Sequence, residues 1–344
     1  MSAASSDRSA EEAVDYSDDE FSWLPSRQPE WEDLKSAPVP VEEVAVAAPV
    51  YSLRYRDMLG LLRYVQESGE KSRRVLDLTA GLISVNAANY TAWDLRWRCL
   101  CKLAEEEGPQ MLQGELEYMQ DIAAVNAKNY QLWNHRRKCS LLIGAEGKEA
   151  ELEFTAEVLV EDAKNYHAWS HRQAIVTAFG LWQEEEHYTR TMITLDVRNN
   201  SAWNERIYVL TRRPPSEGTD TAATRSVEVE EVVLPAVLLA PSNPSPYNFL
   251  RGLYTELSPP APLCSDGHVL KVVEAALAKD RSCVPATELL ADFFVDLAAA
   301  GGAGETAAKQ AFGLFSALEV MDPIRAGYWA HRRAELALLA GMDS

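Results

Sequence analysis

Two side chains that could bind an anion stand close to the asparagine of a repeated motif. Lys128 directly precedes Asn129, and His167 follows Asn165 by two residues. We predict that both asparagines open helices, where free backbone N–H groups and the helix dipole favour a negative charge. A neighbouring lysine or histidine adds charge and hydrogen-bond donors. The spacing is compatible with a phosphate-bearing ligand at these helix N-termini; the alternative is that both side chains are ordinary solvated residues.

Metal and nucleophile chemistry have less support. His135, His171 and His331 each lie two residues after a tryptophan, but they stand in different repeats and form no ligand cluster, so we predict inter-repeat hydrogen bonds instead. The five cysteines form no C-x-x-C pair, which argues against a zinc knuckle or a disulfide framework. No nucleophile–base pair or glycine-rich phosphate loop is present. Any reactive centre would therefore be supplied by another chain.

A repeated motif must position these side chains. Asn-Tyr-x-x-Trp-x-x-Arg opens at Asn89, Asn129 and Asn165, and a near copy opens at Asn199. Its tryptophans are 40, 36 and 34 residues apart, the length of one helix-turn-helix unit. We predict a structural packing role, rather than ligand stacking, for the repeated tryptophans and arginines. These residues are Trp93, Arg96, Trp133, Arg136, Trp169, Arg172, Trp203 and Arg206.

The pattern predicts an all-α fold, an α-α superhelix in which helical hairpins stack as a solenoid. Each unit has an amphipathic first helix and a second helix that the motif asparagine caps. Weaker copies run from Asn243 to Tyr247, where tyrosine replaces tryptophan, and from Trp329 to Arg332. Asn200 replaces the motif tyrosine in the fourth copy.

We divide the chain into an acidic N-terminal arm and a repeat domain. Residues 1–50 carry twelve acidic and three basic residues among Ser, Pro and Ala, so we predict disorder except for an anchoring segment at 23–34. Residues 51–344 form the helical-hairpin domain. The run at 212–231, rich in Pro, Gly, Thr and acidic residues, is predicted to be a loop inserted between units.

Composition excludes some partners. The 33 basic and 52 acidic residues give a net charge of −19, which disfavours nucleic acid and anionic membrane surfaces. No apolar run approaches the roughly 20 residues of a membrane helix, and the acidic start does not resemble a signal peptide. We expect a soluble, cytoplasmic protein with no membrane span.

Four sequence blocks resemble a known family: NAANYTAWDLRWRCL, NAKNYQLWNHRRKCS, DAKNYHAWSHRQAIV and DVRNNSAWNERIYVL. They are similar to the repeats of protein prenyltransferase α subunits, and the resemblance extends over about 29–332. More narrowly, PEWED at 29–33 and NAANYTAW resemble the α subunits shared by protein farnesyltransferase and geranylgeranyltransferase type I. The resemblance implies a crescent of helical hairpins around a β subunit that holds the catalytic zinc and most of the isoprenoid pocket.

The resemblance also implies roles at the helix N-termini. Lys128 matches the family lysine that contacts the isoprenoid diphosphate. His167, with Tyr166 beside it, matches the histidine that does so from the next repeat. These catalytic residues would stabilise negative charge on the diphosphate as its bond to the prenyl carbon breaks. Lys164 aligns with a different family position and is not expected to share the role of Lys128.

Substrate-binding residues are implied in the same way. Gln131 matches the glutamine that hydrogen-bonds the terminal carboxylate of the CaaX substrate. Tyr130 and Tyr90 match tyrosines near the peptide end of the site.

We therefore expect an α subunit that acts only with a β subunit. The pair would transfer farnesyl or geranylgeranyl, depending on the β partner, from the isoprenoid diphosphate to the cysteine of C-terminal CaaX proteins. Zinc would be bound by the β subunit, magnesium would assist the farnesyl diphosphate reaction, and this chain alone would bind neither. Two alternatives stay open: a Rab-type geranylgeranyltransferase α subunit and a non-catalytic helical-repeat scaffold.

Overall fold

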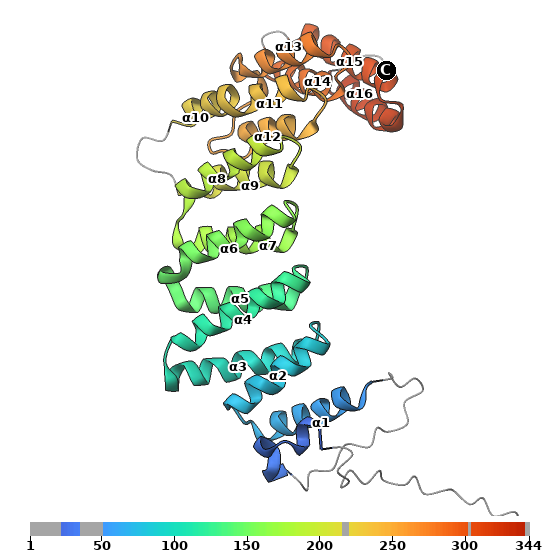
Figure 1. Ribbon diagram of the computed structural model, residues 1–344. Coiled ribbons are helices and arrows are strands. Elements are labelled where there is room, and N and C mark those ends of the chain that lie inside the picture. Colours follow the sequence, from blue (N-terminus) through green and yellow to red (C-terminus); the bar gives the residue numbers. More distant parts are fainter. Residues whose placement is uncertain (1–21, 35–50, 215–219, 302–303, 341–344) are drawn as a thin grey trace, which may run out of the picture. The chain divides into compact units, whose positions relative to one another are not determined.

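The structure is a computed structural model of the chain, and it describes residues 22–34, 51–214, 220–301 and 304–340 (Figure 1). In these ranges the regular elements are all helical, which confirms the predicted all-α class. The chain forms two compact units, residues 1–147 and 148–344. Most of the arm for which we predicted disorder lies outside the described residues.

The first unit is built from two helical hairpins, α2 with α3 and α4 with α5, preceded by α1 and two short 3-10 helices (Figure 1). Its elements are η2 (Pro25–Arg27), η3 (Pro29–Leu34), α1 (Leu53–Ser68), α2 (Arg73–Val85), α3 (Tyr90–Glu107), α4 (Gln110–Asn126), α5 (Tyr130–Ile143) and η4 (Gly144–Gly147).

The second unit continues the hairpin pattern. Its elements are α6 (Lys148–Glu161), α7 (Tyr166–Phe179), α8 (Trp182–Leu195), α9 (Asn200–Arg212), α10 (Thr221–Glu228), a π-helical turn (Val229–Val233), α11 (Leu234–Leu239), α12 (Pro244–Thr255), η6 (Leu263–Ser265), α13 (His268–Lys279), α14 (Val284–Ala299), α15 (Gly304–Met321), η7 (Pro323–Arg325) and α16 (Ala326–Ala340).

The segment predicted to anchor the N-terminal arm packs on α1 and α2. Trp31 is buried under the guanidinium of Arg74, which lies 4.3 Å from the ring centroid and also pairs with Asp33. Asp57 accepts hydrogen bonds from the backbone N–H and the hydroxyl of Ser26, at 2.8 and 2.6 Å. Trp23, by contrast, is half exposed. Among the aromatic side chains of this segment, Trp31 is therefore the anchor.

The motif asparagine has two functions, of which sequence analysis found one. Its side-chain oxygen caps the second helix of its own hairpin, as predicted. In Asn129, Asn199 and Asn243, the side-chain nitrogen also donates to a carbonyl in the turn of the preceding hairpin, and that carbonyl already accepts the indole N–H of its own tryptophan. The Ala163 carbonyl, for example, accepts from Trp169 at 3.0 Å and from Asn199 at 3.1 Å. Within each unit, this doubly bonded turn carbonyl joins successive hairpins.

The same joint recurs where the motif is weak. The acceptor carbonyls are those of Ala87, Ala163, Val197 and Pro241. At Pro241 the donors are the hydroxyl of Tyr247 at 2.6 Å and the thiol of Cys283 at 3.1 Å. Tyrosine thus replaces tryptophan and cysteine replaces asparagine, yet the acceptor keeps two donors.

The motif arginine forms a second joint between hairpins. Arg206 donates to Glu228 in the next hairpin at 2.6 Å from Nε and from Nη2, and to the Glu186 carbonyl and Thr189 hydroxyl of its own hairpin. Arg96 and Arg172 make equivalent sets of bonds. A buried guanidinium with most of its donors used is stable only because its partner carboxylate is also buried.

The register histidines bind carboxylates of their own hairpin, not of the neighbouring repeat as we predicted. His135 Nε2 lies 2.8 Å from Glu115, and His171 Nε2 lies 2.6 Å from Glu151. Burial lowers the pKa of His135, so its neutral ring donates to the carboxylate. Burial opposes ionisation of Glu115, but hydrogen bonds from His135 and Arg96 outweigh it and lower the pKa of that carboxyl.

The prediction of a loop at 212–231 is wrong for most of that segment, which is helical from Thr221 onward. Asp220 caps α10 by accepting from two backbone N–H groups, and the helix continues through the π-helical turn into α11. Local Thr, Val and acidic residues favour other conformations. They are overridden because Arg225 is buried, donates to the Leu253 carbonyl at 2.9 Å, and brings the helix onto α12.

The π-helical turn absorbs one extra residue. Glu115, Glu151 and Glu185 each stand 14 residues before the capping asparagine of their hairpin, at 129, 165 or 199, whereas Glu228 stands 15 residues before Asn243. In the turn, the Leu234 N–H bonds to the carbonyl five residues back, at Val229. Pro235 follows, and its ring could not fit against a regular helical carbonyl. The turn keeps both Glu228 and Asn243 in register.

Substitutions at Asn199 should separate the cap from the joint. Asn199→Ser keeps a capping oxygen but loses the bond to the Ala163 carbonyl, whereas Asn199→Ala loses both. We expect losses in the free energy of unfolding of about 1 kcal/mol for serine and about 2 kcal/mol for alanine, measured by urea denaturation. Equal losses for the two variants would mean that the joint contributes nothing.

Deleting Glu231 together with Pro235→Ala should restore the 14-residue spacing and a regular helix. We expect the free energy of unfolding to change by less than about 1 kcal/mol, since Arg206 keeps its partner. Deleting the exposed Thr191 from α8 is the matched control. It should rotate Glu185 away from Arg172 and cost at least about 3 kcal/mol in a denaturant titration. Similar losses in both proteins would contradict this account.

Candidate functional site

The predicted site residues lie at the turns that open α3, α5 and α7. Tyr90, Tyr130 and Tyr166 each follow a capping asparagine and are 72%, 70% and 68% exposed. Large aromatic side chains exposed to this degree contribute little to a core. The repeat therefore places one accessible phenol at the start of each of these three helices.

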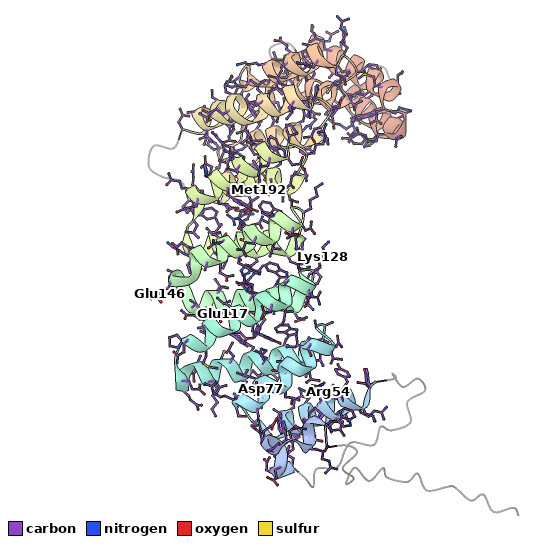
Figure 2. The ribbon with its side chains drawn as sticks, in the orientation of Figure 1. Arg54, Asp77, Glu117, Lys128, Glu146 and Met192 are labelled. Carbon is purple, nitrogen blue, oxygen red and sulfur yellow. The ribbon has the colours of Figure 1, made fainter. Side chains whose placement is uncertain are left out.

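Lys128 and Gln131 flank the capping residue of α5. Lys128 is exposed at the turn between α4 and α5, and Figure 2 shows it at the opposite end of α5 from Glu146. Gln131 is half-buried in the first turn of α5. The Asn129 amide donates to the Ala87 carbonyl at 2.6 Å, so this turn is joined to the turn that opens α3 at Tyr90. The first unit thus brings Tyr90, Lys128 and their neighbours to one edge.

His167 and Tyr166 belong to the second unit, on the first turn of α7. Their rings meet edge-on, with centroids 5.6 Å apart and an interplanar angle of 76°. Partial burial lowers the pKa of His167 below its ordinary value, which favours a neutral imidazole near pH 7. His167 is therefore suited to donate a hydrogen bond rather than to supply a full positive charge.

One part of the sequence argument needs correction. We expected free backbone N–H groups to attract an anion at these helix starts. Asn129 Oδ1 instead accepts from the N–H groups of Gln131 and Leu132, and Asn165 Oδ1 accepts from those of His167 and Ala168, at 2.8 to 3.2 Å. These donors are already used. An anion at either helix start would have to be bound mainly by side chains.

The predicted site residues do not line either of two surface hollows in the described residues. One hollow, of about 180 Å³, lies beside Lys71 and Arg98 in the first unit. The other, of about 460 Å³, lies beside Tyr208 and Glu256 in the second. Neither is lined by a predicted catalytic or substrate-binding residue.

Neither a metal-binding cluster nor a membrane-spanning helix is present in the described part of the chain. There, no group of three or more His, Cys, Asp and Glu side chains is arranged to hold a metal ion. In the same ranges, no helix combines the length and apolar character needed to cross a membrane.

The structure also identifies supporting residues that sequence analysis did not single out. Four buried glutamates form hydrogen bonds with the motif arginines or with the histidines: Glu115, Glu151, Glu185 and Glu228. They hold the helices whose N-termini carry the site. Glu115, Glu151 and Glu185 share a 14-residue distance before the capping asparagine, which was the available sequence signal.

Comparison with known proteins places these repeats in a family. The model of the protein prenyltransferase alpha subunit repeat matches residues 112–142, 148–179 and 182–213. The protein farnesyltransferase/geranylgeranyltransferase type-1 subunit alpha of Pisum sativum is 36% identical over 327 residues, which cover 90% of this chain and 94% of that protein. Its Arabidopsis thaliana counterpart is 37% identical over 334 residues, covering 92% and 97%. This chain belongs to that α-subunit family.

A solved structure extends the family assignment to the fold. The chain resembles part of Candida albicans protein geranylgeranyltransferase-I complexed with GGPP, with a TM-score of 0.71 and 25% identity. The match covers 87% of this chain and 95% of that chain. The predicted α-α superhelix class is thereby confirmed. Gln131 falls in the first repeat matched by the family model and His167 in the second; their assigned roles in this family member stay predictions.

Replacing an exposed tyrosine should affect the stability of the fold much less than replacing a buried tryptophan of the same helix. Tyr166→Ala should change the free energy of unfolding by less than about 0.5 kcal/mol, because the side chain is mostly exposed. Trp169→Ala, three residues along the same helix, should cost about 3–5 kcal/mol, because that indole is buried. Urea denaturation of both variants measures the difference. A large loss for Tyr166→Ala would assign that tyrosine to the core.

Proposed function

We propose that this chain, paired with a separate β subunit, transfers a farnesyl or geranylgeranyl group to the cysteine of a CaaX C-terminus. The observation that carries the proposal is the exposure of side chains at helix starts in a member of the α-subunit family. In the first unit Tyr130 is mostly exposed two residues after the exposed Lys128, and in the second unit Tyr166 is mostly exposed next to His167. Side chains displayed in this way, with the core built by other residues, are available to a ligand or a partner.

The proposed role of Lys128 and His167 is to stabilise the leaving group. As the bond between the diphosphate oxygen and the prenyl carbon breaks, negative charge grows on the diphosphate. The Lys128 ammonium offers a positive charge, and the neutral His167 ring offers an N–H donor. Groups held in place before the reaction stabilise such charge without reorganisation. The caps on α5 and α7 supply that preorganisation, since they fix the backbone on which both side chains stand.

Gln131 is proposed to bind the terminal carboxylate of the protein substrate. Its side-chain amide can donate two hydrogen bonds, which suits a carboxylate acceptor. The first turn of α5 is fixed by Asn129, so the amide starts from a defined position. Tyr130 and Tyr90 would lie at the peptide end of the same edge.

The metals are assigned to other parts of the complex. Zinc, proposed to be held by the β subunit, would bind the substrate thiolate, and magnesium would balance charge on the farnesyl diphosphate. In the described part of the chain, the carboxylates of Glu115, Glu151 and Glu185 are bonded to histidines or motif arginines, so they are not placed to bind a metal ion.

Two lysines at equivalent places provide a matched test. Lys128→Ala in the co-purified α–β complex should lower the single-turnover rate of prenyl transfer by about 100-fold, the size expected for one transition-state donor. Lys164→Ala changes the same position one repeat later and should leave that rate unchanged. Thermal unfolding of both complexes checks that assembly is intact.

Three results would contradict the proposal. Equal effects of the two lysine variants would remove the specific role of Lys128. Unchanged kinetics in both would support a scaffold without catalytic residues. Prenyl transfer by this chain without a β subunit would refute the division of labour.

A further inference from the structure

One hairpin of the second unit replaces a histidine–carboxylate pair with two carboxyls. The residue two positions after the motif tryptophan is His135 in α5, His171 in α7 and Glu205 in α9. Each histidine bonds a glutamate 20 residues earlier on the first helix of its hairpin. The residue 20 positions before Glu205 is Glu185. In the α8–α9 hairpin, an acid therefore occupies the place of a hydrogen-bond donor.

Both carboxyls are buried, and only one has a cation. Glu185 is fully buried and Glu205 is 1% exposed. The two oxygens of Glu185 accept from Arg172 Nε at 2.8 and 2.9 Å. Glu205 Oε2 accepts from the amide of Gln173 at 2.7 Å, while its Oε1 has no hydrogen-bonding partner among the described residues. An anion at Glu205 would thus be buried without a counter-charge, which is costly.

The surrounding elements supply no second cation. From α7, Arg172 and Gln173 face the pair, and from α8, Glu185 and Tyr188 do so. Arg206, the next residue on α9, is paired with Glu228. The titratable groups of α12, which also packs on α9, bond elsewhere: Tyr247 to the Pro241 carbonyl, Arg251 to Asp292 and Tyr254 to Asp266.

We propose that, of the two buried carboxyls, Glu205 holds a proton while Glu185 is the anion paired with Arg172, and that loss of this proton loosens the α8–α9 hairpin. A protonated Glu205 is neutral, as the histidine is in the preceding hairpins, so the buried site carries one negative charge balanced by Arg172. Burial, and then the charge of Glu185, raise the pKa of Glu205 to about 8.

The direction of the pH effect follows from that shift. An unfolded chain ionises Glu205 near its ordinary pKa of 4.5, whereas the folded hairpin keeps the proton up to about pH 8. Between these values the folded state binds the extra proton, so the folding equilibrium constant falls about tenfold for each pH unit of increase. The contribution is complete below pH 4.5 and is lost as pH rises through 8. The stability of the α8–α9 hairpin is therefore expected to fall as pH rises toward 8.

Two substitutions test the proton directly. Glu205→Gln keeps the shape and removes the titration, and Glu205→His recreates the histidine–carboxylate pair of the preceding hairpins. The measurement is backbone hydrogen exchange of the full-length chain in its co-purified complex from pH 6 to pH 9, corrected for intrinsic exchange rates. It does not depend on prenyl transfer.

In the unmodified chain, opening of α8 and α9 should increase by about tenfold between pH 6 and pH 7, while α13 and α14 change much less. Both variants should flatten this dependence. The proposal is overturned if α8 and α9 open with the same pH dependence in the unmodified chain and in Glu205→Gln.

Infrared spectroscopy of the unmodified protein gives an independent result that does not require a variant to fold. A buried protonated carboxyl should be present at pH 6 and disappear as pH rises above 8. Its absence at pH 6 would also overturn the proposal.

Discussion

The doubly bonded turn carbonyl is the interaction on which the repeat architecture depends. It accepts an indole N–H from its own hairpin and an amide N–H from the next, so it fixes two helix starts with one atom. Because the second donor is also the N-cap, a displaced hairpin would lose its cap and its joint together. The positions around each capping asparagine consequently recur along the same edge of successive hairpins within a unit. Lys128, Gln131 and Tyr90 owe their common edge in the first unit to this constraint.

The same constraint determines what kind of site the edge can be. Asparagine uses its oxygen on the first-turn N–H groups and its nitrogen on the turn carbonyl, so helix N-termini that could have bound an anion through the backbone are already satisfied. Binding is left to the residues on either side of the asparagine. These are free to differ between repeats, because none of them enters the joint. A rigid frame with variable neighbours allows Lys128 and His167 to be specialised without disturbing the stacking.

The motif and most of the helices could be predicted because they depend on local spacing. The partners of the motif arginines could not, since Glu115 and Glu228 lie on other helices and only packing brings them into contact. The helix after Asp220 was mistaken for a loop, because valine, threonine and glycine are weak helix formers and the burial that overrides them is tertiary. Cys283 shows a further limit. A thiol in place of an amide is not recognisable as part of the motif until its hydrogen bond to Pro241 is seen.

The arginine joint is less essential than the carbonyl joint, as the hairpin whose second helix is α12 shows. There the arginine position is Leu250, and the positions of its threonine and glutamate partners are Val233 and Val269, all fully buried. Apolar residues can replace a buried ion pair at little cost, but a single unpaired charge costs about 3–5 kcal/mol. Arg206 still has its partner, and the helix forms a π-helical turn rather than move Glu228 out of reach. The helix adopts the irregular turn because that turn costs less free energy than a buried unpaired guanidinium. The ion pair therefore determines the register of this helix.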